Sequence, residues 1–220
     1  MSRTSCLLSV LCLSSALLAV RPQLAAAQNL DYLSLTDTTL AVVRNMPVDD
    51  LKAELDAIST LLSGYEWSKR DADHAKKLIQ ADIDGLKKEI DILKTKIELA
   101  KKEDRMSDRD SLEAYKKTVE TKKEYFEKAA DLREHERRHA EALVAWTKRV
   151  RTYYEKAVQL MDERERGGRE DDLLTLEREL IGEQQAAADR LKDVASEMGR
   201  VADRREDLYK MRKELLKSDK

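Results

Sequence analysis

The amino-acid sequence predicts an all-α protein, an elongated antiparallel coiled coil of three long helices in which a hairpin is followed by a third helix that folds back or pairs in an oligomer. Of the 220 residues, 39% are charged, six are Gly and two are Pro, whereas average proteins have about 25% charged residues and about 7% Gly. Apolar residues recur every three or four positions along three long segments, as in helices of coiled coils. A sandwich, a barrel or a loop-rich α/β enzyme needs more turn residues than this, so these classes are excluded.

Residues 1–27 have the pattern of a secretory signal peptide. A basic start containing Arg3 precedes an uncharged apolar run over 6–20, and small residues at 25–27 precede Gln28. The run is shorter than the roughly 20 residues that span a membrane, and this order of basic, apolar and small residues is typical of a cleaved leader. We therefore expect cleavage after Ala27, with an uncleaved N-terminal anchor as the alternative.

The cysteines and the net charge indicate a compartment and exclude one class of partner. Cys6 and Cys12 both lie in the leader, and the chain has no N-x-Ser/Thr acceptor. An exported protein without disulfides or glycosylation sites fits the bacterial periplasm best. The net charge of −2 becomes more negative when Arg3 and Arg21 are removed, so we expect no nucleic-acid partner.

Residues 28–46 differ in composition from the rest of the chain. From residue 28 to residue 43 the charges are Asp31 and Asp37, among many apolar residues. We expect this segment to cap the open end of the helical bundle or to serve as an exposed docking peptide.

The first helix is expected over 47–104. Pro47 at the entrance and the acids Asp49 and Asp50 in the first turn favour a helix start there. From residue 51, steps of four and three alternate through fifteen positions, all of them apolar except Lys69 and Lys76. This spacing predicts a supercoiled partner helix. The positions are Leu51, Leu55, Ile58, Leu62, Tyr65, Lys69, Ala72, Lys76, Ile79, Ile83, Leu86, Ile90, Leu93, Ile97 and Ala100.

The second helix is expected over 109–166. The heptad register is lost over 101–111, which we interpret as a hairpin turn with Ser107 or Asp108 capping the second helix. Because this stretch contains no Gly or Pro, one continuous bent helix is the alternative. The resumed seam consists of Leu112, Tyr115, Val119, Lys122, Phe126, Ala129, Arg133, Glu136, Ala140, Leu143, Thr147, Val150, Tyr154, Ala157 and Met161.

Folding the chain back at residue 106 supports the hairpin. Facing residues then have numbers that sum to about 212, which places Lys76 opposite Glu136 and Arg133 near Ile79. The polar positions of both seams would therefore share one layer, where a Lys76–Glu136 pair would fix the register.

The second helix carries an additional apolar row, and the first helix has no comparable one. A helix with a wide apolar face contacts two neighbours, so the second helix is expected to be central. The additional row, at seven-residue spacing, is Tyr125, Leu132, His139, Trp146, Tyr153 and Leu160.

The third helix is expected over 169–218, after Gly167–Gly168. If the chain folds back at this Gly pair, facing residues have numbers that sum to about 335. Tyr153 then meets Gly182, and Trp146 meets the alanines at 186–188, so that large side chains face small ones. The apolar positions include Leu173, Leu176, Leu180, Ala187, Leu191, Val194, Met198, Val201, Leu208 and Leu215.

The segment His135–Glu136–Arg137–Arg138–His139 matches H-E-x-x-H. It resembles the zincin metalloprotease motif, and the resemblance implies His135 and His139 as zinc ligands and Glu136 as the general base. The match covers only these five residues, a third ligand at zincin spacing is missing, and the sequence offers no strands for a zincin cleft. We therefore interpret the segment as part of the helix packing.

A basic cluster, Arg137–Arg138 with Lys148, Arg149 and Arg151, has two interpretations. It is either a site for anionic lipid or a solvated helix face whose cations pair with acids one turn away.

The sequence as a whole predicts an exported, periplasmic coiled-coil structural or adaptor protein that acts as a spacer or assembly scaffold. A periplasmic holdase-type chaperone that grips unfolded clients is the alternative, and a zinc-dependent hydrolase is a remote one. We expect no enzymatic activity, no cofactor, and no catalytic, cofactor-binding or metal-binding residues. The expected partner is a protein bound through helical surfaces, including a second copy of the chain, while contact with a membrane surface has no support in the sequence.

Overall fold

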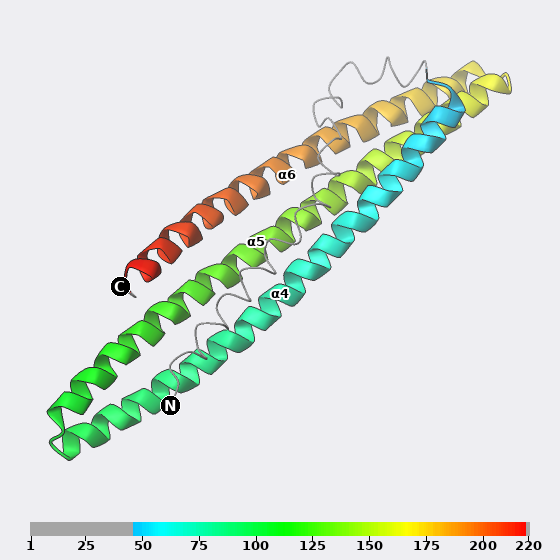
Figure 1. The fold of residues 1–220 in the computed structure, drawn as a ribbon. Coiled ribbons are helices and arrows are strands. Elements are labelled where there is room, and N and C mark those ends of the chain that lie inside the picture. The colour runs from blue at the N-terminus through cyan, green and yellow to red at the C-terminus, as the bar shows by residue number, and fades with distance from the viewer. Residues whose placement is uncertain (1–45, 219–220) are drawn as a thin grey trace. The chain divides into compact units, whose positions relative to one another are not determined.

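The structure, a computed structural model, describes residues 46–218 and consists there of three long helices. The helices are α4 (Val48–Lys102), α5 (Met106–Glu165) and α6 (Glu170–Ser218). Consecutive helices run antiparallel, and α5 packs against both α4 and α6 along its length (Figure 1). The all-α antiparallel prediction, including the hairpin between the first two helices, is confirmed. The expected leader over 1–27 and the apolar segment over 28–46 lie outside the described residues, apart from Met46.

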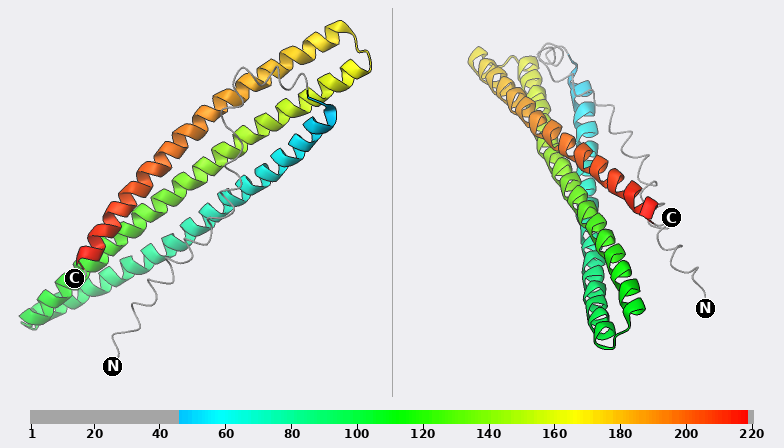
Figure 2. Two further views of the ribbon diagram at one scale, coloured as in Figure 1. Left: turned by 45° about the horizontal axis from the view of Figure 1, so that its top comes forward. Right: turned by 90° about the vertical axis from the view of Figure 1, so that its left-hand side faces the viewer.

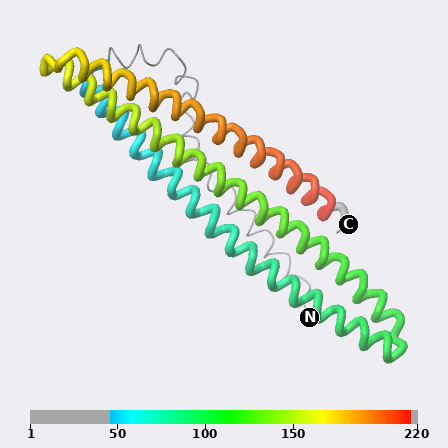
Figure 3. The backbone as a smooth tube through the Cα atoms, turned by 180° about the vertical axis from the view of Figure 1, so that it is seen from behind, coloured from blue at the N-terminus to red at the C-terminus, as the bar shows by residue number. Residues whose placement is uncertain are grey.

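The middle position of α5 is also as predicted. The left view of Figure 2 shows α5 between α4 and α6, and the view from behind shows the same order (Figure 3). The extensive helix–helix contacts of the described residues are those of α4 with α5 and of α5 with α6. The outer helices α4 and α6 therefore depend on the same central helix.

The helix α4 begins where the sequence predicts, after Pro47 and with acids in its first turn. Pro47 is the N-cap residue, with φ −56° and ψ 146°, and its carbonyl oxygen accepts a hydrogen bond from the amide of Leu51 at 3.1 Å. Asp49 and Asp50 occupy the first turn, where the partial positive charge of the helix N-terminus favours acids.

The α4–α5 hairpin turn is a Schellman motif built without glycine. The amide of Arg105 donates to the carbonyl of Ala100 at 2.9 Å, and the amide of Asp104 donates to that of Lys101 at 3.3 Å. Asp104 supplies the left-handed residue, with φ 58°, a conformation that Asp tolerates better than most residues. The expected cap at Ser107 or Asp108 is wrong: α5 has Arg105 as its N-cap residue, without a side-chain cap bond.

The α5–α6 turn is a second Schellman motif, and it requires both glycines. Gly167 has φ 73°, and the amide of Gly168 donates to the carbonyl of Glu163 at 2.8 Å. A Cβ atom on Gly168 would lie only 2.9 Å from that same oxygen. A side chain at either position therefore strains the turn.

The core follows the two apolar rows of α5. Trp146 and Tyr153, from the additional row, are among the largest fully buried side chains. Most of the predicted seam of α4 is buried as well, although Lys122, predicted in the seam of α5, is exposed. The buried core residues of α6 are Leu180, Ala187, Val194 and Val201.

We expect the glycines to respond to alanine in opposite directions. Gly167→Ala should lower the free energy of unfolding by about 1–2 kcal/mol, because an L-residue is strained in the left-handed region. Gly85→Ala, in the interior of α4 with nothing within 4 Å of the added Cβ, should raise it by about 0.5–1 kcal/mol. Urea denaturation of both variants measures the contrast, and equal effects would contradict this account of the turn.

Candidate functional site

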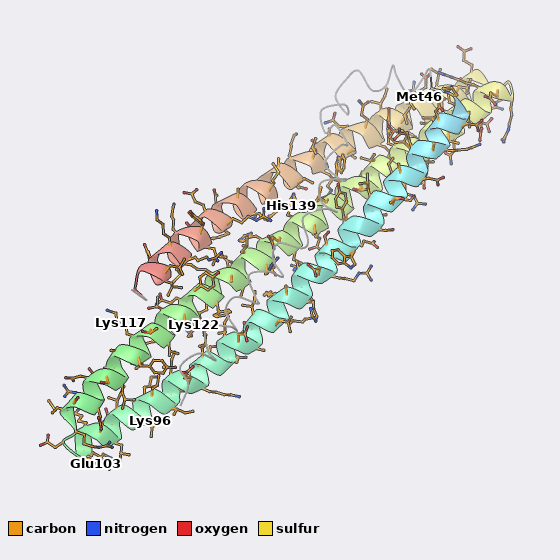
Figure 4. All side chains as sticks on the ribbon, viewed as in Figure 1. Met46, Lys96, Glu103, Lys117, Lys122 and His139 are labelled. Atoms are coloured by element: carbon orange, nitrogen blue, oxygen red, sulfur yellow. The ribbon has the colours of Figure 1, made fainter. Side chains whose placement is uncertain are left out.

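The most densely charged part of α5 is residues 131–141, which we call the central belt. It contains the H-E-x-x-H match and lies along the middle of α5, where Figure 4 marks His139. Successive residues of a helix point in directions about 100° apart, so the belt presents some of its side chains to α4 and others to α6. The two sides carry separate ion-pair networks.

Glu134 is the centre of the network on the α4 side. Its carboxylate accepts hydrogen bonds from Lys76 Nζ at 3.2 Å, from Arg138 Nε at 2.9 Å and from two nitrogens of Arg137 at 2.9 and 3.1 Å. The hydrogen bonds from Arg137, followed by those from Arg138 and Lys76, hold the pKa of Glu134 far below its usual range, although partial burial opposes them. The carboxylate is therefore ionised at any physiological pH.

Glu141 extends this network by one turn. It lies 2.8 Å from Lys69 Nζ and 3.0 Å from Arg137 Nη1, and the hydrogen bond from Lys69 lowers its pKa. Lys69 and Lys76, the two polar positions in the predicted seam of α4, therefore both reach acids of α5. These two lysines of the α4 seam therefore form ion pairs between α4 and α5.

The predicted pairing of Lys76 with Glu136 is wrong, because Lys76 reaches Glu134. The seam of α5 shifts by one residue before the belt: Ala130 is buried in place of Ala129. The shift is local, because the buried Ala140, Leu143, Thr147, Val150 and Ala157 again occupy the predicted seam positions. Within the belt, Glu136 binds Arg205 of α6 and not Lys76 of α4.

Glu136 instead belongs to the network on the α6 side. Its carboxylate accepts a hydrogen bond from Arg205 Nη2 of α6 at 2.8 Å and from Arg133 Nη1 at 2.7 Å. Arg204 of α6 lies 3.0 Å from Asp131. The Arg204–Asp131 pair and the Lys156–Glu179 pair both fit the register predicted for α5 and α6.

His135 faces α6 as well, beside Glu197. Nδ1 of His135 lies 3.6 Å from Oε2 of Glu197, and both atoms are buried without a hydrogen-bond partner. Nε2 of His135 lies 3.8 Å from Asp131. These separations are too long for hydrogen bonds.

His139 is half-buried, and burial lowers its pKa, with the nearby Arg205 acting in the same direction. The histidine is therefore held in its neutral form, as expected for a side chain in the row of Leu132 and Trp146. His74, the other histidine of the chain, is exposed on α4.

The residues of the H-E-x-x-H match take part in the contacts between α5 and α6. Within residues 46–218, no group of three His, Cys, Asp or Glu residues is placed to hold a metal ion. The carboxylate of Glu136, which the resemblance makes the general base, is occupied by two arginines. The ion pair of Glu136 with Arg205 holds α5 and α6 together.

The basic cluster is largely neutralised by acids. Arg137 and Arg138 bind Glu134, Arg149 lies 3.3 Å from Glu183 of α6, and Arg151 lies 2.9 Å from Glu155. These contacts favour the interpretation as a solvated helix face over a site for anionic lipid. No helix within residues 46–218 is both long enough and apolar enough to cross a membrane.

Two depressions on the surface are lined mostly by charged residues. One lies between α4 and α5, where Ile97 is its apolar residue, and the other lies between α5 and α6, where Ala142 and Ala145 are its apolar residues. Sites for small molecules are usually apolar and enclosed. Neither depression has that character.

The structure also exposes apolar residues that the sequence reasoning did not single out. On α4 they include Leu78, Ile92 and Leu99; on α6 they include Leu174, Ile181 and Tyr209. The set on α6 follows seven-residue spacing, so a search for a second row on that helix would have found it. On α4, Gly85 stands at the heptad position between Leu78 and Ile92, so the sequence gives only an interrupted row there. Compared with known protein families, curated proteins and solved structures, the chain matches none of them.

Glu134→Ala should lower the free energy of unfolding by about 1–3 kcal/mol, because it leaves partly buried cations without their acceptor. Glu155→Ala, which removes an exposed pair with Arg151, is the matched control and should cost at most about 0.5 kcal/mol. Since the pKa of Glu134 is lowered in the folded state, its contribution is complete above the ordinary carboxyl pKa of about 4.3 and is lost as the pH falls further. Urea denaturation at pH 7 and pH 3 tests this, and a cost that is undiminished at pH 3 would contradict it.

His139→Leu should keep or raise thermal stability, because leucine extends the apolar row. The difference in thermal stability between this variant and the wild type should grow below about pH 6.5, because the buried imidazole of the wild type must then stay neutral at a cost to folding. Glu136→Ala should lower stability, because Arg133 and Arg205 lose their acceptor. Thermal unfolding with and without a chelator tests both; bound zinc together with a chelator-induced loss of stability would restore the metal-site interpretation.

Proposed function

We propose that the chain is an exported, periplasmic coiled-coil adaptor that acts as a spacer or assembly scaffold, without enzymatic activity. The observation that carries this proposal is the free apolar face on each outer helix, α4 and α6, of a long helical unit. A helix of the 60 residues of α5 is about 90 Å long at 1.5 Å per residue. Such a unit can hold two partners tens of ångströms apart.

The free face of α4 is arranged to receive a helix. Leu78, Ile92 and Leu99 share one heptad position, at which Gly85 stands between Leu78 and Ile92, and each of the three is about half exposed. Ile92 is two residues from the buried Ile90, which turns it well away from α5. A row of this spacing suits a partner helix that supercoils with α4.

The charge distribution supports a structural role over catalysis. The carboxylates of the central belt that could act as bases are held by lysine and arginine side chains. General acid–base catalysis requires a group that can exchange protons near the working pH, and the lowered pKa of Glu134 has moved far from that range.

Export rests on the leader-like pattern of residues 1–27, and the periplasm on the lack of cysteine after it. Fractionation of the native host with N-terminal sequencing tests this part. We expect a periplasmic chain beginning at Gln28, and a cytoplasmic chain beginning at Met1 would overturn it.

A holdase-type chaperone is the second candidate, because exposed apolar side chains also bind unfolded clients. A holdase differs from an adaptor in the range of its partners. It binds many clients through adaptable surfaces, whereas an adaptor binds one or a few through a defined row.

Photo-crosslinking in cells separates the two candidates. A photoreactive residue at Ile92 should give one or a few discrete adducts, while the same residue at the exposed Lys117 of α5 (Figure 4) should give none. The purified chain should not reduce the aggregation of a heat-denatured test protein at equimolar ratio. A continuous smear of adducts together with suppressed aggregation would favour the holdase and overturn the adaptor.

A further inference from the structure

Two apolar rows run side by side along α6. The inner row contains the residues that α5 buries, Leu180, Ala187, Val194 and Val201. The second row begins one residue later and has an apolar residue at every seventh position without exception. We call it the α6 row; it consists of Leu174, Ile181, Ala188, Ala195, Ala202, Tyr209 and Leu216.

The α6 row lies at the surface of the helical unit. Its large members are between 44% and 69% exposed, and Met198, beside the row, is 58% exposed. Among the described helices, the extensive contact of α6 is with α5. A position about 100° around the helix from the inner row is therefore left without a partner helix.

The spacing of the α6 row identifies a helix as its partner. On a straight helix, residues seven apart drift by about 20° per repeat, so an uninterrupted seven-residue row follows one direction only when two helices supercoil. A solvated face needs no apolar residue at each of these positions. The α6 row has the form of a coiled-coil seam.

The order of side-chain sizes identifies the partner as a second copy of this chain. The row reads large, large, small, small, small, large, large, and it is symmetric about Ala195. A two-fold axis at Ala195 would set Leu174 against Leu216 of the second copy, and Ala188 against Ala202. An interface that repeats itself under two-fold rotation must be self-complementary in this way.

Small residues also occupy the place where such helices approach most closely. The three alanines of the row are at its centre, and Gly199 lies beside them with nothing within 4 Å of a Cβ built on it. Small side chains let two helix backbones come near each other, while the larger residues fill the space toward the ends.

The charges along α6 favour the antiparallel direction. Residues 170–185 contain six acids and one base, whereas residues 203–217 contain four acids and six bases. An antiparallel pair sets the acidic end of one copy against the basic end of the other, and a parallel pair would set like against like. On one flank of the row, Leu191 would meet Met198, while Glu177, which would lie opposite Arg212, is already paired with Arg164 of α5.

The other flank carries one unfavourable pair. In the same alignment Arg178 would meet Lys213 of the second copy, and the two cations would repel at the rim. Because rim charges have modest effects, this pair weakens the association without preventing it, and it offers a direct test of the alignment.

We propose that two copies of this chain associate through α6, antiparallel, across a two-fold axis at Ala195. The row from 174 to 216 is about 63 Å long at 1.5 Å per residue. With a contact about 10 Å wide on each copy, the interface would bury about 1,200 Å² in total, at the lower end of stable protein–protein interfaces. The association is independent of what α4 binds, so its failure would leave the proposed adaptor function standing.

Sedimentation equilibrium of the full chain tests the association. We expect a dimer whose dissociation constant rises at least tenfold in Ala195→Glu, because that substitution places two like charges at the axis while the side chain is exposed in the single copy. Ala81→Glu, on an exposed position of α4, is the matched control and should leave dissociation unchanged. The proposal would be overturned if the chain stayed monomeric at the highest concentration measured. It would also be overturned if the two variants had equal effects on dissociation.

Charge variants at the rim test the alignment without depending on damage to the fold. Arg178→Glu and Lys213→Glu should each strengthen dimerisation, because each converts a repulsive pair into an attractive one. The double variant restores like charges and should return the dissociation constant toward that of the wild type. Additive strengthening, or no change in the single variants, would contradict the alignment.

Cysteine pairing tests the direction. In a chain with Cys6→Ser and Cys12→Ser, mixing the Ala188→Cys and Ala202→Cys variants should give the mixed disulfide, since bonded cysteines need Cα atoms within about 7 Å. Ala188→Cys alone should give none. A disulfide between two Ala188→Cys chains would indicate a parallel pair and overturn the antiparallel arrangement.

Discussion

The helical unit depends on the burial of two apolar rows of α5. Trp146 and Tyr153 are almost wholly excluded from solvent, and aromatic side chains of this size contribute much of the energy of a core. Because one central helix supplies both interfaces, α4 and α6 need only one apolar face each for the fold. Their remaining faces are free to serve other contacts, and this is where the exposed apolar rows lie.

The central belt gives this packing its register. Ion pairs that lose solvent add little net stability, but they exclude wrong alignments. The acids of the belt form ion pairs with both neighbouring helices. Glu134 and Glu141 pair with lysines of α4, and Glu136 pairs with an arginine of α6. If α4 slipped by one heptad toward the α5 C-terminus, Lys69 would leave Glu141 and meet Lys148, so repulsion would replace an ion pair.

The periodicity of apolar residues in the sequence was sufficient to predict the three helices, the hairpin and the central position of α5. The predicted α5–α6 register, with facing numbers that sum to about 335, agrees with the Arg204–Asp131 and Lys156–Glu179 pairs. The predicted contact of Tyr153 with Gly182 is wrong, because Gly182 is exposed and a Cβ atom built on it has nothing within 4 Å. The predicted ion-pair partner of Lys76 was two residues off, because Lys76 binds Glu134 and not Glu136, although the buried residues from Ala140 to Ala157 keep the predicted heptad positions. The turn at Asp104 has no composition signal, because its left-handed residue is not glycine. The α6 row was readable as a pattern, but its exposure follows only from which face α5 covers.

The positions of the two free rows connect the proposed function with the proposed dimer. α4 and α6 lie on different sides of α5 (Figures 1 and 3), so an interface formed by α6 does not use the row of Leu78, Ile92 and Leu99 on α4. A two-fold axis at Ala195 would then carry two copies of the α4 row outward, one on each side of the assembly. Each row could bind a partner while the α6 pair holds them apart, with a separation set by two helical units. Dimerisation would thus turn the single docking face of α4 into a symmetric pair of docking faces.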